Sequence, residues 1–371
     1  MPPVSMMIKP VSSACNMHCR YCFYADVASH RETADYGVMD ETVLRELVRK
    51  AFLYADQSVA FSFQGGEPTL AGLPFYEAFL RAVRRYNSRN LPVTCALQTN
   101  GYELDDALLD FFAEQRFLLG VSLDGTQRTH DACRRDRQGS GTYERVRKNI
   151  ERIRARGIAY NILCVVTPEI ASRGKECWDS LKEHRYLQFI PCIDGFSGPP
   201  GVDSLSAADY GRFLIDTFDC YEKAIYAGNP VSERRFDNYI GILLGREPEQ
   251  CGMSGVCGQY FAAEADGGIY PCDFYVLDAW RMGDIRRSSL LRMAQSDAAR
   301  SFRGASLEKP AVCRQCRWAF LCRGGCRRDR ENAEGINRFC ESYTRFFEAR
   351  CERMRRLAAA VGGRKAGADR D

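Results

Sequence analysis

Residues 15–22 read CNMHCRYC, so three cysteines in the spacing CxxxCxxC stand on one predicted loop with a histidine among them. A structural zinc site requires four ligands in a closed tetrahedron, and His18 could complete one only if the loop doubled back. Three thiolates on one loop instead suit a four-iron cluster whose fourth iron stays open for an outside ligand. The spacing therefore predicts an open iron–sulfur cluster with three ligands: Cys15, Cys19 and Cys22.

Six apolar segments rich in β-forming residues alternate with helical patterns, and the first of them runs into this loop. They are residues 4–12, 59–64, 93–100, 117–125, 159–166 and 186–194. Apolar stripes at helical spacing separate most of them, as in residues 40–55 and 142–157. Such alternation predicts a parallel sheet with helices outside it. Six units favour a partial barrel over a doubly wound sheet.

Polar and glycine-bearing signatures follow three of these strands: GGEP at 65–68, TNG at 99–101 and SLDG at 122–125. In parallel α/β folds, chemistry gathers at the carboxyl ends of the strands. A phosphate loop is disfavoured because no Gly-Lys-Ser/Thr follows GGEP. Taken alone, GGEP could be a tight turn, but its place beside the cysteine loop predicts a shared site.

A second group of cysteines lies beyond a domain boundary that we place near residues 230–250. It is densest in CRQCRWAFLCRGGC at 313–326, and it provides enough thiolates for two fully ligated four-iron clusters. A pair of zinc ribbons would use similar spacing, so zinc remains an alternative for this group. The eight cysteines are Cys251, Cys257, Cys272, Cys313, Cys316, Cys322, Cys326 and Cys340.

Composition narrows the classes of partner. The 52 basic residues nearly cancel the 48 acidic ones, which leaves a net charge of +4 and no footprint for nucleic acid. No run reaches the about 18 apolar residues of a membrane helix, and the first ten residues lack a secretory signal. We therefore expect a cytoplasmic protein without a membrane partner, in which 18 cysteines are not explained by disulfides.

CNMHCRYC together with GGEP resembles the radical S-adenosylmethionine superfamily. The cysteine-rich part resembles its SPASM extension, in which Cys257, Gly267 and Cys272 precede CxxC-x5-CxxxC and a last cysteine. MPPVSMMIKPVSSACNMHCRYCFY, FQGGEPTLAG, LQTNG, YPCDFYVLD and CRWAFLCRGGCRRDRE are similar to anaerobic sulfatase-maturating enzymes. The resemblance covers about residue 1 to about residue 350.

The resemblance implies an α/β fold with a partial (β/α)6 barrel of the radical SAM type in residues 1–235. A cysteine-rich SPASM extension carrying two auxiliary clusters would occupy residues 236–350, followed by a basic helical or disordered tail at 351–371. The implied cofactors are S-adenosyl-L-methionine and three [4Fe-4S] clusters, one that binds S-adenosylmethionine and two auxiliary clusters.

The resemblance also assigns residues to roles. Asp273 would be the catalytic base. Apart from the resemblance, Gln64, Gln98 and Asn100 stand at predicted strand ends and could hold a substrate peptide. Arg134 suits a carboxylate partner, although its neighbour Arg135 makes this assignment ambiguous and both could be surface charges. The residues implied at the S-adenosylmethionine site are Tyr21 (through its main chain), Gly66, Ser122, Arg134 and Ile193.

The implied function is oxidation of a cysteine or serine of a sulfatase to Cα-formylglycine under anaerobic conditions. The sulfatase segment would carry Cys/Ser-x-Pro/Ala-x-Arg, a flavodoxin or ferredoxin would donate electrons, and the enzyme would be a monomer. An alternative is another radical SAM/SPASM enzyme that forms thioether or C–C crosslinks or epimers in a ribosomal peptide. A non-enzymatic electron carrier or zinc-stabilised module is a weaker alternative, because it leaves GGEP without a role.

Overall fold

The computed structural model describes residues 3–196 and 201–368, and the six predicted strands are all present in it as β1–β6. They pair in parallel and in chain order, which confirms the predicted barrel-type sheet. The strands of the described residues are β1 (Val4–Ile8), β2 (Val59–Phe63), β3 (Val93–Thr99), β4 (Leu118–Ser122), β5 (Tyr160–Val166), β6 (Tyr186–Pro191), β7 (Ser232–Glu233), β8 (Phe261–Ala263), β9 (Gly268–Tyr270) and β10 (Gly283–Asp284).

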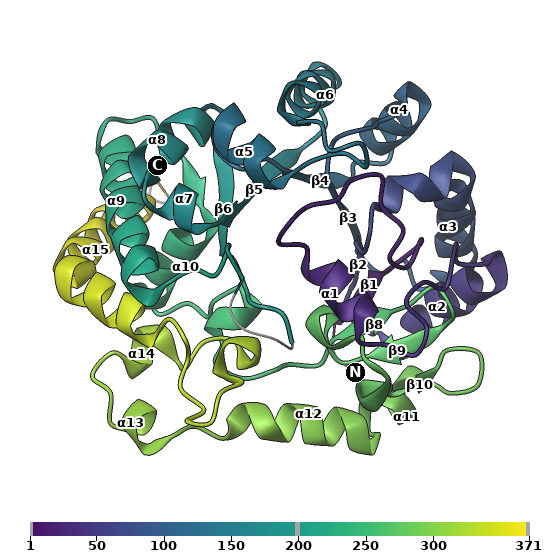
Figure 1. Ribbon diagram of the computed structural model, residues 1–371. Helices are drawn as coiled ribbons and strands as arrows, with labels where there is room; N and C mark the ends of the chain where they lie inside the picture. Colours follow the sequence, from purple (N-terminus) through teal and green to yellow (C-terminus); the bar gives the residue numbers. More distant parts are fainter. Residues whose placement is uncertain (1–2, 197–200, 369–371) are drawn as a thin grey trace.

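All ten strands belong to one sheet in the order β10-β9-β8-β1-β2-β3-β4-β5-β6-β7. The sheet curves into a partial barrel with its helices outside, and α1 lies inside the ring near β1 (Figure 1). The α-helices of the described residues are α1 (Phe23–Ser29), α2 (Glu41–Tyr54), α3 (Gly72–Tyr86), α4 (Asp106–Glu114), α5 (Gln127–Cys133), α6 (Tyr143–Ala155), α7 (Pro168–Ala171), α8 (Gly174–Leu181), α9 (Ala207–Tyr226), α10 (Arg234–Leu243), α11 (Leu290–Ala294), α12 (Asp297–Leu307), α13 (Ala311–Arg314), α14 (Ala319–Cys322) and α15 (Cys340–Ala368).

The core lies between the outer face of the strands and the surrounding helices. Phe61 and Phe63 of β2 are buried there, and both contact Phe79 of α3 edge-on with ring centroids 5.0 Å apart. Successive strand side chains point to opposite faces, so Ser62 and Gln64 face the barrel interior. The apolar residues of β2 thus hold the helices outside, and its polar ones line the site.

Local capping explains where helices begin. The Asp40 carboxylate accepts the Val43 N–H at 2.9 Å, which starts α2 one residue after the predicted boundary. Ser206 likewise accepts the Asp209 N–H at 3.1 Å at the start of α9. Among the described residues, no helix combines the length and apolar character that a membrane span requires.

The hairpin β8–β9 joins the cysteine-rich part to the barrel. Strand β8 pairs in parallel with β1, with Met6 opposite Phe261, and the predicted turn lies at Asp266 and Gly267. A buried ion pair lies beside this junction: Arg31 donates to Glu264 at 2.5 Å. The barrel and the cysteine-rich extension therefore share one sheet.

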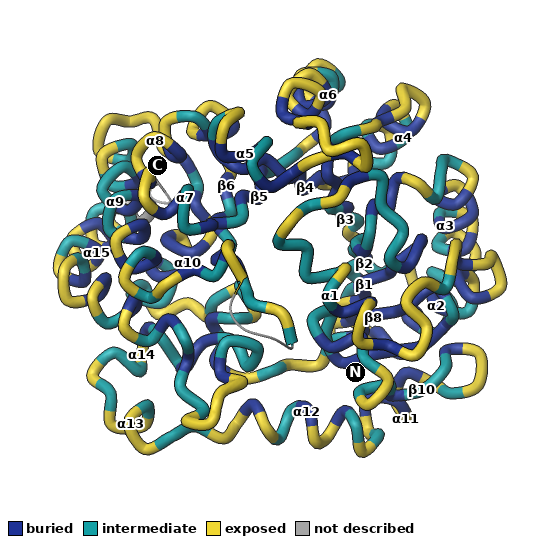
Figure 2. Tube along the Cα trace, viewed as in Figure 1, coloured by how far each residue is buried: buried dark blue, intermediate teal, exposed yellow. Residues whose placement is uncertain are grey.

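The sequence predicts a basic helical or disordered tail at residues 351–371, and in the structure helix α15 runs from Cys340 to Ala368 and is packed rather than free. Met354 and Leu357 of α15 are fully buried, and α15 packs along α9 and α10. Its arginines lie against acidic residues of α9, as in the bond from Arg350 to Asp219 at 2.8 Å. Apolar residues are few among the many basic residues of this segment, so the sequence alone does not show that the helix is packed. Figure 2 shows exposed segments confined mainly to the outward turns of the helices.

Candidate functional site

The cluster loop, residues 13–22, connects β1 to α1 and brings its three cysteines close together. Burial, with smaller contributions from the nearby Cys22 and Cys15 thiols, raises the pKa of the Cys19 thiol to about 12, and the charge of Arg134 opposes this rise. Burial also raises the pKa of Cys15, again with a contribution from Cys22. Three crowded thiolates repel one another unless a cation neutralises them. The donor set therefore fits an iron–sulfur cluster held by three cysteines.

His18 lies outside this group. Its side chain is exposed, and its backbone N–H donates to the Arg135 carbonyl at 2.8 Å. A bridge between Met17 and Asp136 fixes the same part of the loop. The loop thus does not double back to bring His18 to the thiols.

The GGEP motif is fastened to the cluster loop through its backbone. The Gly66 N–H donates to the Ser12 carbonyl at 3.1 Å, and the Glu67 N–H donates to the Ala14 carbonyl at 2.8 Å. A Cβ on Gly66 would lie 1.9 Å from the Ala14 oxygen, so no other residue fits there. Close approach of two protein segments is thus one reason for this glycine, besides the predicted approach of a ligand.

The buried Glu67 carboxylate links GGEP to TNG. It accepts hydrogen bonds from the Thr69 hydroxyl at 2.7 Å, the Thr99 hydroxyl at 2.9 Å and the Asn100 N–H at 2.7 Å. Burial raises the pKa of Glu67, and these donors oppose the rise. Glu67 thus links the ends of β2 and β3 next to the cluster loop.

Asn100 has contacts other than those we expected for a peptide-binding residue. Its side-chain Nδ2 lies 2.8 Å from Asn16 Oδ1 and 3.6 Å from Cys15 Sγ. Its Oδ1 accepts the Tyr102 N–H at 2.9 Å. All of these partners belong to the cluster loop or the TNG turn, because the strand end directs Asn100 toward the loop.

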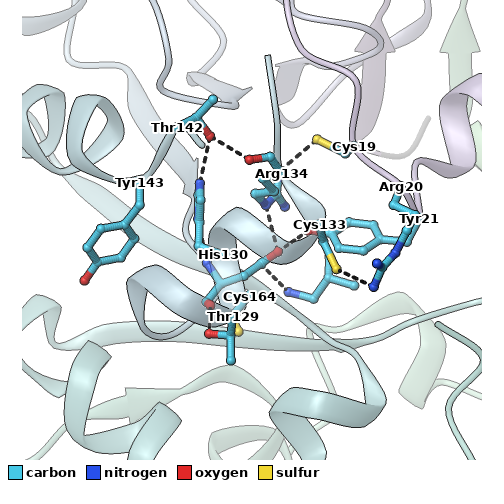
Figure 3. Close-up of polar contacts among 12 residues, drawn as sticks. Cys19, Arg20, Tyr21, Thr129, His130, Cys133, Arg134, Thr142, Tyr143 and Cys164 are labelled. Carbon is cyan, nitrogen blue, oxygen red and sulfur yellow. Dashed lines mark hydrogen bonds and ion pairs between the residues drawn. The ribbon is translucent and has the colours of Figure 1, made fainter. Parts of the chain in front are cut away.

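Arg134 belongs to a buried ion pair at the ends of β4 and β5. Its Nε donates to Asp124 Oδ2 at 2.8 Å, and its Nη1 lies 3.9 Å from Cys19 Sγ. The guanidinium also lies 5.4 Å from the centroid of the Tyr21 ring, whose hydroxyl donates to Asp124 (Figure 3). Asp124 Oδ1 accepts the Val165 N–H at 2.9 Å. Burial opposes the charge of Arg134, but Asp124, Tyr21 and Cys19 together outweigh burial and raise the pKa of Arg134.

The neighbouring arginine, Arg135, lies at the surface and does not join this ion pair. Arg135 is exposed, and its side chain donates to the carbonyls of Asp131 and Gly139 at 3.0 and 3.1 Å. Arg134 is only 7% exposed. Of the two arginines, Arg134 is therefore the one beside the cluster loop.

A buried neutral histidine, His130, contacts Asp124 directly and Arg134 through Thr142. His130 Nδ1 accepts the Asp124 N–H at 3.2 Å, and Nε2 lies 3.0 Å from the Thr142 hydroxyl. That hydroxyl donates to the Arg134 carbonyl at 3.1 Å, and Figure 3 shows His130, Thr142 and Arg134 in this chain. Burial lowers the pKa of His130 to about 4, so the ring is neutral with its proton on Nε2.

Two further predicted cofactor residues lie at strand ends. Ser122 is buried at the end of β4, and Ile193 is half-buried just after β6. The segment with Ile193 is fixed from the cysteine-rich part: Arg338 pairs with the Asp194 carboxylate at 2.7 Å, and Arg328 donates to the Asp194 carbonyl at 2.8 Å. The extension thus positions one edge of the predicted cofactor site.

Arg20 connects the cluster loop to the segment before α9. Its guanidinium donates two hydrogen bonds to the Asp203 carboxylate, both at 2.6 Å, and a third to Cys133 Sγ at 3.3 Å. Such forked pairing fixes both partners in direction as well as distance. The middle of the cluster loop is thus anchored at a point remote in sequence.

The eight C-terminal cysteines form two groups that interleave in sequence. In the first group, burial raises the pKa of Cys326 to about 12, with smaller contributions from Asp329, Cys251 and Cys257. Burial also raises the pKa of Cys272, with contributions from Cys326 and Cys251. These four thiols therefore lie together, with Cys326 separated from its sequence neighbour Cys322.

The second group surrounds a cavity of about 370 Å³ lined by Cys313, Cys316, Cys322 and Cys340. Burial raises the pKa of Cys322 to about 11, with smaller contributions from the other three thiols. A single zinc ion would hold four sulfurs about 2.3 Å from one centre and leave no space of this size. The cavity and its four thiols fit a cubane cluster.

Asp273 directly follows the cluster cysteine Cys272. Its Oδ2 accepts the Tyr24 hydroxyl at 3.4 Å, and Tyr24 also donates to Gln64 at 2.8 Å. Burial raises the pKa of Asp273, and the positive charge of Lys9 lowers it. The Lys9 ammonium is buried and lies 4.7 Å from the centroid of the Tyr24 ring. The predicted base thus lies between α1, which follows the cluster loop, and the first auxiliary group.

Sequence reasoning missed three contributors to this site. Asp124 stands in the SLDG motif, where only Ser122 was assigned. Glu67 stands in GGEP, where only the glycines were given a role. Lys9 could have been found, because a lysine inside an apolar strand signals a buried charge that needs a partner.

Comparison with known proteins adds independent findings. Residues 10–171 match the family model of the radical SAM superfamily, and residues 254–317 match that of the SPASM iron-sulfur cluster-binding domain. A cysteine-type anaerobic sulfatase-maturating enzyme of Clostridium novyi (strain NT) is 40% identical over 98% of this chain and 100% of its own length. A serine-type anaerobic sulfatase-maturating enzyme of Klebsiella aerogenes is 30% identical over 98% of this chain and 89% of its own length.

A solved structure has the same architecture. Native anSMEcpe with bound AdoMet and Cp18Cys peptide superposes with a TM-score of 0.92 at 38% identity, covering 97% of this chain and 100% of that chain. The likeness therefore includes the barrel and the cysteine-rich extension together.

Proposed function

The chain belongs to the anaerobic sulfatase-maturating enzymes, and on this premise we propose that it is a cysteine-type member. It would oxidise the cysteine of a Cys-x-Pro/Ala-x-Arg segment in a sulfatase to Cα-formylglycine. The higher identity to the cysteine-type relative supports this choice over a serine target. The observation that carries the proposal is the position of Asp273, between the open three-cysteine loop and a closed four-cysteine group.

Three cysteines would hold the cluster that binds S-adenosylmethionine: Cys15, Cys19 and Cys22. When bound, this cluster and S-adenosylmethionine supply radical chemistry that removes a hydrogen atom from Cβ of the target residue. The protein contributes binding and orientation. Gly66 exposes backbone beside the cluster loop, and Arg134, held by Asp124, presents a guanidinium that suits a carboxylate. Ser122, Ile193 and the main chain of Tyr21 would complete this pocket.

Asp273 would act as the base. Loss of the Cβ hydrogen atom leaves one electron and the thiol proton to be removed before a carbon–sulfur double bond can form. An Asp273 carboxylate oxygen would take that proton, while the Tyr24 hydroxyl, which also contacts Gln64, lies 3.4 Å from the carboxylate and orients it. Water then adds to the carbon–sulfur double bond, and sulfur leaves as hydrogen sulfide to give the aldehyde. The eight auxiliary thiols would hold the acceptors for the electron.

The remaining assignments are proposals of the same kind. We assign residues 1–235 to the radical SAM barrel, 236–350 to the SPASM domain and 351–371 to a basic helical or disordered tail. None of the 18 cysteines, all of which lie in the described residues, forms a disulfide, and we propose a reducing compartment such as the cytoplasm. A flavodoxin or ferredoxin would serve as electron donor to a monomeric enzyme.

The variant Asp273→Asn tests the proposed base. We expect it to cleave S-adenosylmethionine at close to the wild-type rate but to form aldehyde at least 10²-fold more slowly, the usual range for a general base. Liquid chromatography of the cleaved cofactor and mass spectrometry of the peptide measure both. Aldehyde formation at the wild-type rate would remove Asp273 from the reaction. A crosslinked peptide would instead favour the alternative radical SAM/SPASM activity.

A further inference from the structure

The amide of Asn100 lies directly beside a cluster ligand. Its Nδ2 is 3.6 Å from Cys15 Sγ and 2.8 Å from Asn16 Oδ1, so its two N–H bonds have two acceptors. The side chain is only 9% exposed. Water therefore competes little with the sulfur for this donor.

The orientation of this amide is fixed by its other bonds. Oδ1 accepts the Tyr102 N–H at 2.9 Å, so exchanging the oxygen and nitrogen would bring Nδ2 against another donor. The backbone N–H donates to the buried Glu67 carboxylate at 2.7 Å, which holds the residue itself. Asn100 therefore presents a donor, and not an acceptor, to Cys15.

The sulfurs of the cluster loop receive donors of different kinds. Cys15 Sγ accepts the Met17 N–H at 3.4 Å in addition to Asn100, and Arg134 Nη1 lies 3.9 Å from Cys19 Sγ. Reduction adds a negative charge that is shared with the ligand sulfurs, and an N–H donor stabilises a more negative sulfur better. A donor at Cys15 should therefore favour the reduced state.

We propose that Asn100 is a positioning residue that raises the reduction potential of the cluster at Cys15, Cys19 and Cys22 through an N–H···S hydrogen bond. This role rests on the proposed function only in requiring that cluster. It also explains why TNG and GGEP meet at the loop: Glu67 holds Asn100 by its backbone while Asn100 holds Cys15 by its sulfur.

The test is a redox titration of the anaerobically purified full-length enzyme, followed by electron paramagnetic resonance. The cluster at the loop is identified as the signal component that changes when S-adenosylmethionine is added. The variants are Asn100→Leu, which keeps volume and removes the donor, and Asn100→Ala, which removes both. Gln98→Ala is the matched control, because it deletes an amide near the same end of β3, and no hydrogen bond from Gln98 to a cluster cysteine is seen among the described residues.

We expect both Asn100 variants to lower the equilibrium constant for one-electron reduction of this component by about tenfold, or about 59 mV. The other components and the Gln98→Ala variant should keep their wild-type potentials. Equal potentials in wild type and both Asn100 variants would overturn this inference alone. Loss of the component from a folded variant would also overturn it and assign Asn100 a purely structural role. A wild-type enzyme with no component sensitive to S-adenosylmethionine would overturn the proposed function itself.

Discussion

Replacing Gly66 by alanine should separate the cluster loop from the GGEP motif. The new Cβ would lie 1.9 Å from the Ala14 oxygen, and ordinary contact begins at 3.4 Å. The two segments must then move apart by about 1.5 Å, the difference between these distances. That movement breaks the bond from Gly66 to Ser12, at 3.1 Å, and strains the bond from Glu67 to Ala14, at 2.8 Å.

The size of the effect follows from these contacts. Overpacking costs about 1–3 kcal/mol and the one lost hydrogen bond about 1 kcal/mol, so we expect a loss of roughly 2–4 kcal/mol in the free energy of unfolding. The displaced loop carries Cys15 only one residue after Ala14. Gly66→Ala should therefore lose about four of the about twelve irons that three four-iron clusters contain.

Iron and protein determination after anaerobic purification, with a denaturant titration, measures both effects. Gly304→Ala is the matched control, because its Cβ would meet nothing within 4 Å in α12. An alanine there should stabilise the helix by about 0.5–1 kcal/mol. If Gly66→Ala keeps its full iron content and binds S-adenosylmethionine normally, the close approach of the two motifs is not needed for the site.

Three other predictions test separate parts of the structure. Cys322→Ser and Cys326→Ser should each remove about four irons, because the two thiols belong to different clusters. The double variant should lose about eight irons. A double variant that loses only about four would refute the division of the thiols into two groups. Asp124→Asn should cost about 3–5 kcal/mol in denaturant unfolding, because it leaves the Arg134 charge buried and unpaired; a change below 1 kcal/mol would contradict this. Burial lowers the pKa of His130 from 6.5 to about 4. Between pH 6.5 and pH 4, only the unfolded chain therefore binds a proton at this residue. The free energy of unfolding should fall by about 1.4 kcal/mol for each pH unit below 6.5. His130→Gln should remove that part of the pH dependence, and an unchanged slope would count against it.

Much of the barrel follows from the sequence because its signals are local. Period-two apolar segments and helical stripes mark β1–β6 and their helices, and strand ends mark the edge where the motifs meet. The extension is different. The pairing of β8 with β1 depends on contacts more than 250 residues apart, which no local pattern encodes.

The sequence predicts those parts of the site in which residue type and spacing alone identify the chemistry. The three cysteines of the loop are an example. The partition of the other eight was not predictable, because Cys322 and Cys326 stand four residues apart yet lie in different groups. Asn100 shows the same limit: a polar residue at a strand end suggests a ligand, but only the fold shows that its amide meets Cys15.

The most direct test of the central claim is maturation of a sulfatase peptide. The anaerobic enzyme, with reductant and S-adenosylmethionine, is incubated with two peptides that differ only in Cys or Ser at the target position of x-Pro-x-Arg. We predict that mass spectrometry detects an aldehyde at the cysteine, trapped by a hydrazine, faster than at the serine. A crosslinked peptide, or cofactor cleavage that leaves the cysteine unchanged, would contradict the assignment as a cysteine-type sulfatase-maturating enzyme.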